Sequence, residues 1–351
     1  MTTYRFSKNV TIGKHTIGAG EPTYVIAEAG VNHNGDIALA KKLIDTAVSA
    51  GADAVKFQLF NTDALIKADV KKAAYQVGNK TDSQSQYEML KALEISADEC
   101  KVLAEYAATK SIDFLVTPFD EPSLSFLATL GLSALKISST DLTNTPFLLD
   151  AAKIGVPIIL STGMSEQSEV DHAISAIHEA CKDVVLLQCT SSYPAPEADL
   201  NLRVIRKYAE DYGIIAGYSD HTVGIGASPY AVAAGALVIE KHFTLDKTLP
   251  GPDHQASLSP DELISFMREI RRVDTMMGRN IKRVELCERE NRLSLQKCLV
   301  ASCHIEPGVA FNESNICAKR TGGVGIPANY VQSVYGKLAT KLLNVGDIVN
   351  V

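Results

Sequence analysis

The sequence predicts a (β/α)8 barrel followed by a small C-terminal domain, and two observations carry this prediction. Eight short runs rich in Val, Ile and Leu follow one another, separated by segments with helical spacing of apolar residues. Runs of this kind are typical of parallel strands that are buried on both faces. The eight units occupy roughly 220 residues, which is the size expected of such a barrel. The chain has 351 residues, so a remainder is left for a second, smaller domain.

The expected elements follow in a regular order. Residues 9–18 form a short hairpin, and the eight strands are 24–28, 54–58, 114–117, 134–138, 157–161, 184–188, 214–217 and 237–240. A last helix is expected over 259–277, because Ser259 and Pro260 supply an N-cap and a proline at the first helical position. The alternative is a doubly wound sheet, but the glycines at 224 and 226 do not complete a dinucleotide-binding fingerprint.

We therefore expect three parts. Residues 1–282 form the barrel with its N-terminal hairpin, and the highly charged residues 283–294 form a linker. Residues 295–351 contain short β-like runs and Gly-rich turns, which suits a small domain with a thin core.

Composition excludes some classes of function. Lys and Arg number 34 against 41 Asp and Glu, a formal net charge of −7, which argues against a nucleic-acid or anionic-membrane binder. No apolar run reaches the ~18 residues of a membrane span, and the start lacks a signal-peptide pattern. The seven cysteines form no Cys-x-x-Cys pair, so we expect reduced thiols in a cytoplasmic protein.

Polar residues gather at the expected strand ends, where barrel enzymes place their chemistry. Lys56 and Lys136 lie inside apolar runs, where a lysine is costly unless it is paired or faces a ligand. With nearby serines they could bind a phosphate group, or they could form internal ion pairs with Glu28 or Glu240.

Other strand-end residues allow two interpretations each. His221 and His242 follow neighbouring strands and could hold a divalent metal, although each could also be a satisfied core histidine. Glu28 is a candidate general acid/base or an orienting partner for a lysine. Asp253, in the stiff loop after the last strand, could reach over the barrel mouth or merely stabilise that loop.

Taken together, the motifs resemble the sialic acid synthase family over nearly the whole chain. The matching segments are Ala-Glu-Ala-Gly-Val-Asn-His-Asn-Gly at 27–35, Ala-Val-Lys-Phe-Gln at 54–58, Thr-Pro-Phe at 117–119, Leu-Lys-Ile-Ser-Ser at 135–139, Leu-Ser-Thr-Gly-Met at 160–164, Gln-Cys-Thr-Ser-Ser-Tyr-Pro at 188–194, Gly-Tyr-Ser-Asp-His-Thr at 217–222, Ile-Glu-Lys-His-Phe-Thr-Leu-Asp at 239–246 and Pro-Gly-Pro-Asp at 250–253. The tail, with Ala-Lys-Arg-Thr-Gly at 318–322, resembles the family's antifreeze-like (SAF, β-clip) domain.

The resemblance implies a phosphoenolpyruvate-dependent transferase, which condenses phosphoenolpyruvate with an N-acetylated mannosamine-type sugar and releases phosphate. It implies phosphoenolpyruvate binding by Lys56, Lys136, Ser139, Ser161 and Ser219. It assigns catalytic roles to Glu28, Lys56, Asp141 and Asp253. Sugar contacts would come from Asp141, Ser191, Tyr193, Asp253 and, from the partner subunit of a domain-swapped homodimer, Arg320. It also implies a divalent metal on His221 and His242, most often Mn2+, with Mg2+ or Co2+ as options.

This chain departs from the family pattern at three points. Thr140-Asp141 replaces a common Gly-Glu, Thr321 replaces a usual proline, and Ser191 replaces a sugar-binding asparagine. We expect an N-acetylneuraminate synthase, and as the alternative a legionaminic acid synthase acting on a 2,4-diacetamido-2,4,6-trideoxy sugar, with residues 78–89 shaping the sugar site. A remote alternative is a non-catalytic sugar- or ice-binding protein that uses the small domain.

Overall fold

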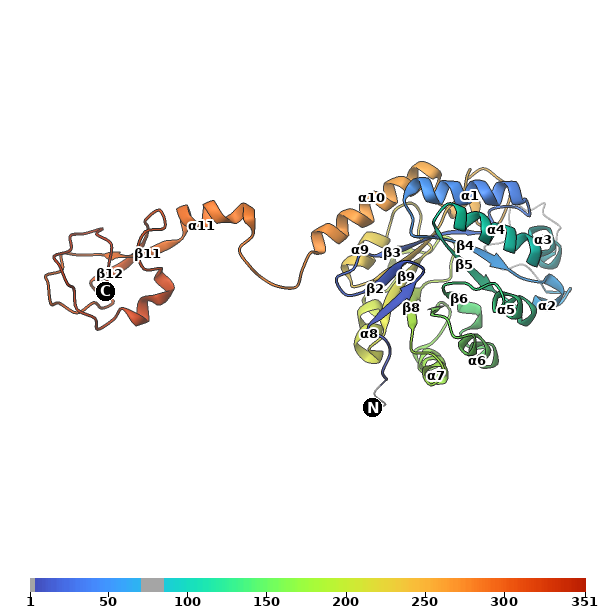
Figure 1. Cartoon of the computed structure of the whole chain (residues 1–351), viewed down its shortest axis with the longest axis horizontal. Helices are drawn as coiled ribbons and strands as arrows, with labels where there is room; N and C mark the ends of the chain where they lie inside the picture. Colours follow the sequence, from blue (N-terminus) through green and yellow to red (C-terminus); the bar gives the residue numbers. More distant parts are fainter. Residues whose placement is uncertain (1–3, 71–84) are drawn as a thin grey trace. The chain divides into compact units, whose positions relative to one another are not determined.

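The computed structural model describes residues 4–70 and 85–351, and these divide into two compact units, Met1–Gly278 and Arg279–Val351. The first unit holds the predicted barrel (Figure 1). Its end at residue 278 lies close to the boundary expected at 282.

The first unit is built on a sheet of eight parallel strands. In chain order these are β3 (Tyr24–Gly30), β4 (Ala54–Leu59), β5 (Asp113–Pro118), β6 (Leu135–Ile137), β7 (Ile158–Ser161), β8 (Val184–Cys189), β9 (Ile215–Asp220) and β10 (Val238–His242). Hydrogen bonding runs unbroken from β5 through β4, β3, β10, β9, β8 and β7 to β6. The end strands β5 and β6 also lie in contact, so the sheet curls into a barrel. All eight strands predicted from the sequence are confirmed.

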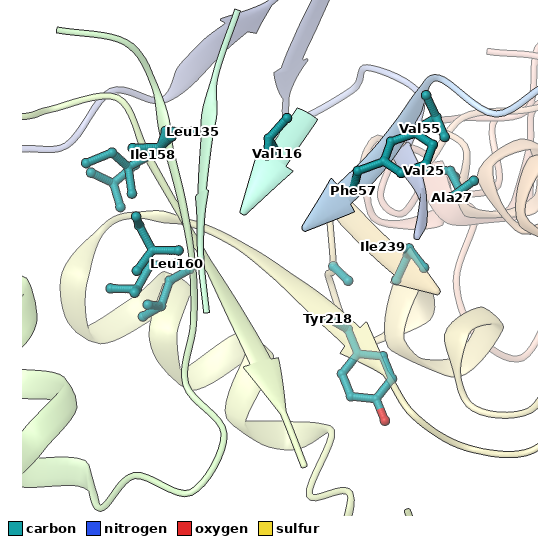
Figure 2. Close-up of a cluster of buried hydrophobic side chains, with 14 of the residues drawn as sticks. Val25, Ala27, Val55, Phe57, Val116, Leu135, Ile158, Leu160, Tyr218 and Ile239 are labelled. Atoms are coloured by element: carbon teal, nitrogen blue, oxygen red, sulfur yellow. The ribbon is translucent and has the colours of Figure 1, made fainter. Parts of the chain in front are cut away.

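Successive side chains of each strand point alternately into the barrel and outward to the helices, and this gives two apolar cores. Inward-facing residues such as Ile26, Ala54, Leu115 and Val185 fill the barrel interior. The outward-facing neighbours pack under the helices, among them Val25, Ala27, Val55, Phe57, Val116 and Ile239 (Figure 2). Because both faces are buried, the strands are continuous apolar runs in the sequence.

The predicted hairpin is also confirmed, as β1 (Asn9–Ile12) and β2 (His15–Gly18). Its Val10, Ile12 and Ile17 pack with the interior residues of the barrel, below the first layer of strand side chains. One end of the barrel is thereby filled with apolar side chains, which leaves the carboxyl ends of the strands for the site.

The helices surround the sheet (Figure 1). They are α1 (Ile37–Ala50), α2 (Thr62–Leu65), α3 (Gln86–Leu93), α4 (Ala97–Thr109), α5 (Glu121–Leu127), α6 (Thr145–Lys153), α7 (Gln167–His178), α8 (Arg203–Tyr212), α9 (Ser228–Ala233) and α10 (Pro260–Met277), with short 3-10 turns at Ser139–Asp141, Glu197–Asp199 and His254–Ala256. Local chemistry sets their starts: Ser259 caps α10 and forms a capping box with Glu262, as the Ser-Pro pair predicts. In the described residues, no helix is both long and apolar enough to span a membrane.

The second unit has its own small core. Leu299, Ile305, Phe311, Val334 and Leu343 are buried together, around the antiparallel strands β11 (Lys297–Ala301) and β12 (Ile316–Arg320) and the turn Ala328–Ser333. The expected linker is not extended throughout, because it contains the short turn Leu286–Glu288 and the exposed helix α11 (Arg289–Leu295).

Candidate active site

A cavity of about 400 Å3 opens where the strands of the barrel end. Most of the predicted site residues line it: Glu28, Lys56, Lys136, Ser139, Ser161, Ser191, Tyr193, Ser219, His221, His242 and Asp253. Side chains two residues apart on a strand point to the same face, so Glu28 stands one step above Ile26, and Lys56 one step above Ala54. A polar layer thus lies directly on the apolar interior of the barrel.

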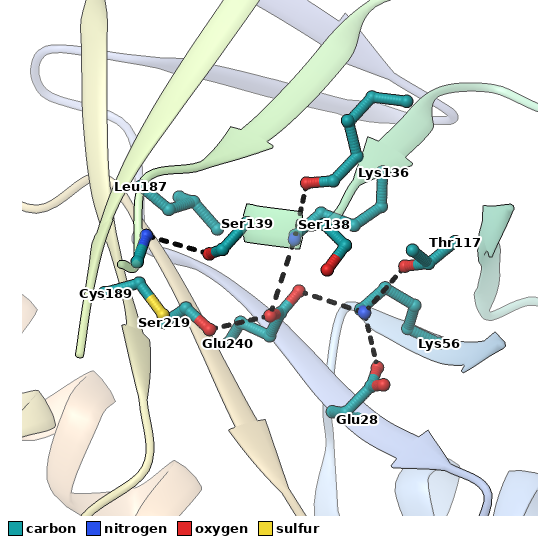
Figure 3. Close-up of polar contacts among 12 residues, drawn as sticks. Glu28, Lys56, Thr117, Lys136, Ser138, Ser139, Leu187, Cys189, Ser219 and Glu240 are labelled. Atoms are coloured by element: carbon teal, nitrogen blue, oxygen red, sulfur yellow. Dashed lines mark hydrogen bonds and ion pairs between the residues drawn. The ribbon is translucent and has the colours of Figure 1, made fainter. Parts of the chain in front are cut away.

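Two lysines and two glutamates form the base of the cavity, and we call these four residues the inner network (Glu28, Lys56, Lys136 and Glu240). Lys56 Nζ lies 2.9 Å from Glu28 Oε2 and 3.4 Å from Glu240 Oε2, and it donates to Thr117 Oγ1 at 3.0 Å. Lys136 Nζ lies 3.8 Å from Glu240 Oε1 and donates to the carbonyl oxygen of Ile137 at 3.0 Å (Figure 3). The ion pairs that the sequence offered as an alternative are therefore present, inside the cavity that was predicted to receive phosphate.

The two glutamates of this network differ in acidity. Burial raises the pKa of Glu28, and the nearby charge of Lys56 only partly offsets that effect. Burial acts on Glu240 too, but Lys136 and Lys56 outweigh it and lower the pKa to about 2. Glu240 thus stays ionised, whereas Glu28 is the carboxyl group that takes up a proton more readily.

Hydroxyl groups complete this part of the cavity. Ser219 Oγ donates to Glu240 Oε1 at 2.8 Å, and Ser139 Oγ accepts from the backbone N–H of Gly163 at 2.8 Å. A Cβ atom at position 163 would lie 2.1 Å from Ser191 Oγ, so glycine is needed there to let the backbone pass this close to the serine side chain. Among the described residues, Ser161 Oγ is buried without a hydrogen-bond partner.

The two histidines lie together above this layer. Their ring centres are 5.6 Å apart, and the Tyr193 ring lies 4.2 Å from that of His221. His221 Nδ1 is 3.2 Å from the carbonyl oxygen of Thr190, whereas His242 Nδ1 is buried and has no partner in the described part of the chain. Burial and the charge of His221 lower the pKa of His242 well below its usual value, which keeps this imidazole neutral and able to bind a cation.

The remaining possible ligands of a cation are few. Burial lowers the pKa of His221, but the adjacent Cys189 sulfur and Glu240 outweigh it and raise the value overall, so a bound cation would have to displace that proton. The described residues contain no group of three His, Cys, Asp or Glu side chains arranged to hold a metal. The two imidazoles fit a cation whose other ligands are substrate oxygens and water.

A second buried ion pair lies on the outer face of the sheet, at β9 and β10, and we call it the outer network (Asp220, Lys241, Thr222 and Ser228). Lys241 Nζ lies 3.1 Å from Asp220 Oδ1, and Asp220 also accepts from Thr222 Oγ1 and Ser228 Oγ at 2.6 Å each. Asp220 precedes His221 and Lys241 precedes His242, so this network fixes the backbone from which both rings project.

Asp253 enters the cavity from the loop after β10. Burial raises the pKa of its carboxyl group to about 6. Ser257 Oγ donates to the Asp253 carbonyl oxygen at 2.6 Å, and Asn32 Nδ2 donates to Ser257 Oγ at 3.0 Å. The loop after β3 therefore holds the loop that carries Asp253.

The structure does not bring every predicted residue to the cavity. Asp141 does not line it, and its carboxylate instead accepts from Thr140 Oγ1 at 3.1 Å and Asn144 Nδ2 at 3.4 Å, while Thr140 lies on the cavity wall. Arg320 is exposed on β12 of the second unit. Of the segment expected to shape the sugar site, residues 78–84 lie outside the described residues.

Three lining residues carried no assigned role in the sequence. The sequence predicts Glu240 only as an ion-pair partner for a lysine, and it shows Thr117 only as part of a motif. For Cys189 the sequence predicts only a reduced thiol, yet its Sγ lines the cavity 3.6 Å from His221 Nδ1. Burial raises the pKa of the Cys189 thiol, but the charge of His221 and hydrogen bonds with His221, Ser191 and Ser139 outweigh burial and lower the pKa to about 7. Their inward positions on β5, β8 and β10 are the signal that would have identified all three.

Known proteins are similar to this chain over most of its length. The model of the NeuB family matches residues 43–282. The N,N'-diacetyllegionaminic acid synthase of Campylobacter jejuni is 44% identical over 333 residues, covering 93% of this chain and 98% of that protein. The enzyme of the same name from Legionella pneumophila is 41% identical over 334 residues, covering 94% of each.

A solved structure extends the likeness to three dimensions. The N-acetylneuraminic acid synthetase of Leptospira borgpetersenii superposes with a TM-score of 0.73 at 37% identity, covering 83% of this chain and 98% of that one. The family model spans well over half of the chain, and the relatives are aligned almost from end to end. The chain therefore belongs to the NeuB family, the sialic acid synthases, and is a biosynthetic enzyme of the transferase class.

Proposed function

We propose that the protein condenses phosphoenolpyruvate with 2,4-diacetamido-2,4,6-trideoxymannose to form N,N'-diacetyllegionaminic acid and phosphate. The observation that carries the reaction type is the inner network: two buried lysines beside two carboxylates of different acidity. A non-catalytic sugar- or ice-binding protein has no use for such a costly arrangement.

The lysines are the proposed site for phosphoenolpyruvate. Lys56 and Lys136 are balanced by Glu28 and Glu240 in the free enzyme, so the cavity base is close to neutral. An entering phosphate would take over part of the lysine charge and find hydroxyl donors in Ser139, Ser161 and Ser219. Ser161, whose buried Oγ lacks a partner among the described residues, gains the most from such a ligand.

The proposed reaction balances in bonds and protons. Carbon C3 of phosphoenolpyruvate attacks the aldehyde carbon of the open-chain sugar, and the aldehyde oxygen takes up a proton. Water adds to C2 and gives up one proton; the bond from C2 to the phosphate oxygen then breaks, the hydroxyl left on C2 becomes the carbonyl, and its proton leaves with phosphate. Glu28 can move these protons because its pKa is raised, and ionised Glu240 stabilises positive charge that develops at C2.

A divalent metal, most often Mn2+ in this family, fits His221 and His242, and when bound it would polarise the aldehyde oxygen. Neutral His242, whose Nδ1 has no partner among the described residues, supports this assignment. Asp253 and Tyr193, which line the same end of the cavity, are the proposed contacts to the sugar together with Ser191.

The choice of acceptor reverses the order expected from the sequence. The relatives named as legionaminic acid synthases are 41% and 44% identical, whereas the N-acetylneuraminic acid synthetase is 37% identical. These values favour the diacetamido sugar, and N-acetylmannosamine becomes the second candidate.

Phosphate release tests the proposal. The enzyme is treated with a chelator, dialysed, and assayed with phosphoenolpyruvate plus either sugar, before and after addition of Mn2+. We expect release that needs both Mn2+ and a sugar, and that is faster with the diacetamido sugar. No release with either sugar would contradict the synthase, and undiminished release after chelation would remove the role of His221 and His242.

We also propose a domain-swapped homodimer in which Arg320 reaches the site of the partner. The proposal rests on the resemblance of residues 318–322 to the family's antifreeze-like domain, and Arg320 is exposed on β12, where a partner could reach it. Arg320→Ala should lose activity, whereas Lys319→Ala, its exposed neighbour, should not. When Arg320→Ala and Lys56→Met chains are refolded together, about a quarter of the sites should regain every residue if sites are shared between chains. No recovery would contradict the swap.

A further inference from the structure

One wall of the cavity differs in character from its base. Apolar side chains dominate it, and we call these six the apolar wall (Val31, Phe60, Leu65, Ile66, Leu90 and Phe119). These side chains offer no hydrogen-bond donor or acceptor. Gln86, one helical turn before Leu90 on α3, is the polar residue beside them. The cavity is thus amphipathic, with charged groups at its base and apolar side chains on one side.

The apolar wall is a built feature of the fold. Val31 and Phe60 are buried with Met89 and Leu93, and Leu65, Leu90 and Phe119 pack against them. The Phe60 and Phe119 rings meet edge to face with centres 6.3 Å apart. The wall therefore has a small apolar core of its own, which holds its shape.

Polar anchors fix the two short helices that carry this wall. Glu94 Oε2 accepts from Thr62 Oγ1 at 2.7 Å, which ties the end of α3 to the start of α2. Asp120 Oδ2 accepts from the backbone N–H of Asn61 at 2.7 Å, which ties α2 to the end of β5. Leu65, Ile66 and Leu90 are held by these bonds at the surface of the cavity, where they remain half-buried.

The reaction fixes which end of the acceptor lies at the charged base and which end is left to meet the cavity walls. The aldehyde carbon C1 must lie at the charged base, where phosphoenolpyruvate is attacked, so the C4–C6 end points away from the lysines. N-acetylmannosamine carries hydroxyl groups at C4 and C6, and these would lose their water against hydrocarbon without replacement. A C6 methyl group and an acyl group at C4 would instead gain from burial there.

We propose that the apolar wall is the acceptor-specificity element of the enzyme, and that Leu65, Ile66 and Leu90 select a 6-deoxy sugar bearing an acylamino group at C4. This inference rests on the proposed function and adds the residues that enforce it. It predicts that polarity on this wall, and not at the charged base, decides between the two candidate sugars.

The test is a pair of polar substitutions, Ile66→Thr and Leu90→Gln, made singly and together in the full chain. The control is Met164→Gln, which changes an exposed apolar residue that lines the cavity outside this wall. For each protein, kcat/KM is measured with both sugars at saturating phosphoenolpyruvate, and the KM for phosphoenolpyruvate is measured separately.

We expect the double variant to lower the preference for the diacetamido sugar by about 10- to 100-fold, the range typical of small changes in a hydrophobic specificity pocket. The KM for phosphoenolpyruvate should stay unchanged in all variants, which also reports that the fold is intact. Met164→Gln should leave the preference as in the wild type.

Three results would overturn the inference, and they can be told apart. If the wild type prefers the diacetamido sugar and the wall variants keep that preference, the apolar wall does not select the acceptor, and the proposed function is unaffected. If the wild type prefers N-acetylmannosamine, the proposed acceptor fails and the inference fails with it. If Met164→Gln shifts the preference as strongly as the wall variants, selectivity belongs to the cavity in general.

Discussion

The inner and outer networks are two buried ion-pair clusters on opposite faces of the barrel sheet, joined at β10, and they differ in how completely their polar atoms are hydrogen-bonded. In the outer network, Asp220 receives hydrogen bonds on both oxygens and pairs with Lys241. In the inner network, the described residues leave Glu28 Oε2 and Glu240 Oε2 without a hydrogen bond of good geometry, although both lie near Lys56.

This difference separates structure from function. A buried charge is costly unless it is paired and hydrogen-bonded, so a complete set of partners marks a cluster that only has to hold the fold. An incomplete set beside a cavity marks groups whose missing partners arrive with a ligand. Substitutions in and around the two networks test that distinction, and their expected effects range from large to none.

The largest effect should follow Lys56→Met in the inner network. This change removes the cation shared by Glu28 and Glu240 and half of the proposed phosphate site, so we expect kcat/KM to fall about 10³-fold, which is about 4 kcal/mol of transition-state stabilisation. The fold should survive, because Lys136 still pairs with Glu240 and Glu28 can accept a proton. Steady-state phosphate release and chemical denaturation measure the two properties; loss of folding with unchanged activity per folded molecule would reverse our assignment.

The matched change in the outer network is Lys241→Met, and there the damage should appear in stability. It leaves the carboxylate of Asp220 buried without its cation, and breaking such a pair typically costs about 3–5 kcal/mol. Denaturant unfolding should show this loss, which must exceed that of Lys56→Met. Equal losses in both variants would show that satisfaction of hydrogen bonds does not distinguish the two clusters.

The positions of the inner-network lysines could be predicted from the sequence, because strand side chains repeat with a period of two residues. Alternation along each strand, together with the rule that barrel sites lie at strand carboxyl ends, places Lys56 and Lys136 at the cavity base. The choice of partners needed the register. Glu28 lies opposite its ion-pair partner Lys56 across β3 and β4, and Glu240 lies opposite its hydrogen-bond donor Ser219 across β9 and β10.

The segments beyond the strand ends could not be predicted in the same way. After β6 the chain turns at once into the 3-10 turn Ser139–Asp141, which ends the alternation and leaves Asp141 bonded to Asn144 and away from the cavity. The apolar wall was likewise missed, because Leu65, Ile66 and Leu90 sit on an insertion between β4 and β5. Their spacing there is ordinary for helices that pack on a core.

A third and smaller effect concerns Asp253, on the open side of the inner network. The pKa of Asp253 is 3.8 as a free side chain and about 6 in the folded protein. In the absence of metal, the carboxyl group of Asp253 therefore binds a proton when the chain folds at a pH between these two values. The contribution of Asp253 to stability is therefore fully present below about pH 4 and is lost as the pH rises through 6. Asp253→Asn should be more stable than the wild type above pH 6 and equal to it near pH 4. Denaturation curves across this range check the crossover, and a constant difference would show that Asp253 is not held in its neutral form.

The smallest effect is expected where an ion pair is short but exposed. On α8, Arg206 Nε lies 2.7 Å from Glu210 Oε1, closer than any lysine–carboxylate distance in the inner network, yet both side chains are mostly in solvent. Water screens such a pair, and ordering two long side chains offsets most of its attraction. Arg206→Ala should therefore leave both the free energy of unfolding and kcat/KM within error of the wild type. A measurable loss of stability in Arg206→Ala would mean that the distance between the charges alone sets how much an ion pair stabilises the fold. Burial and missing hydrogen-bond partners could then no longer explain why the inner and outer networks differ.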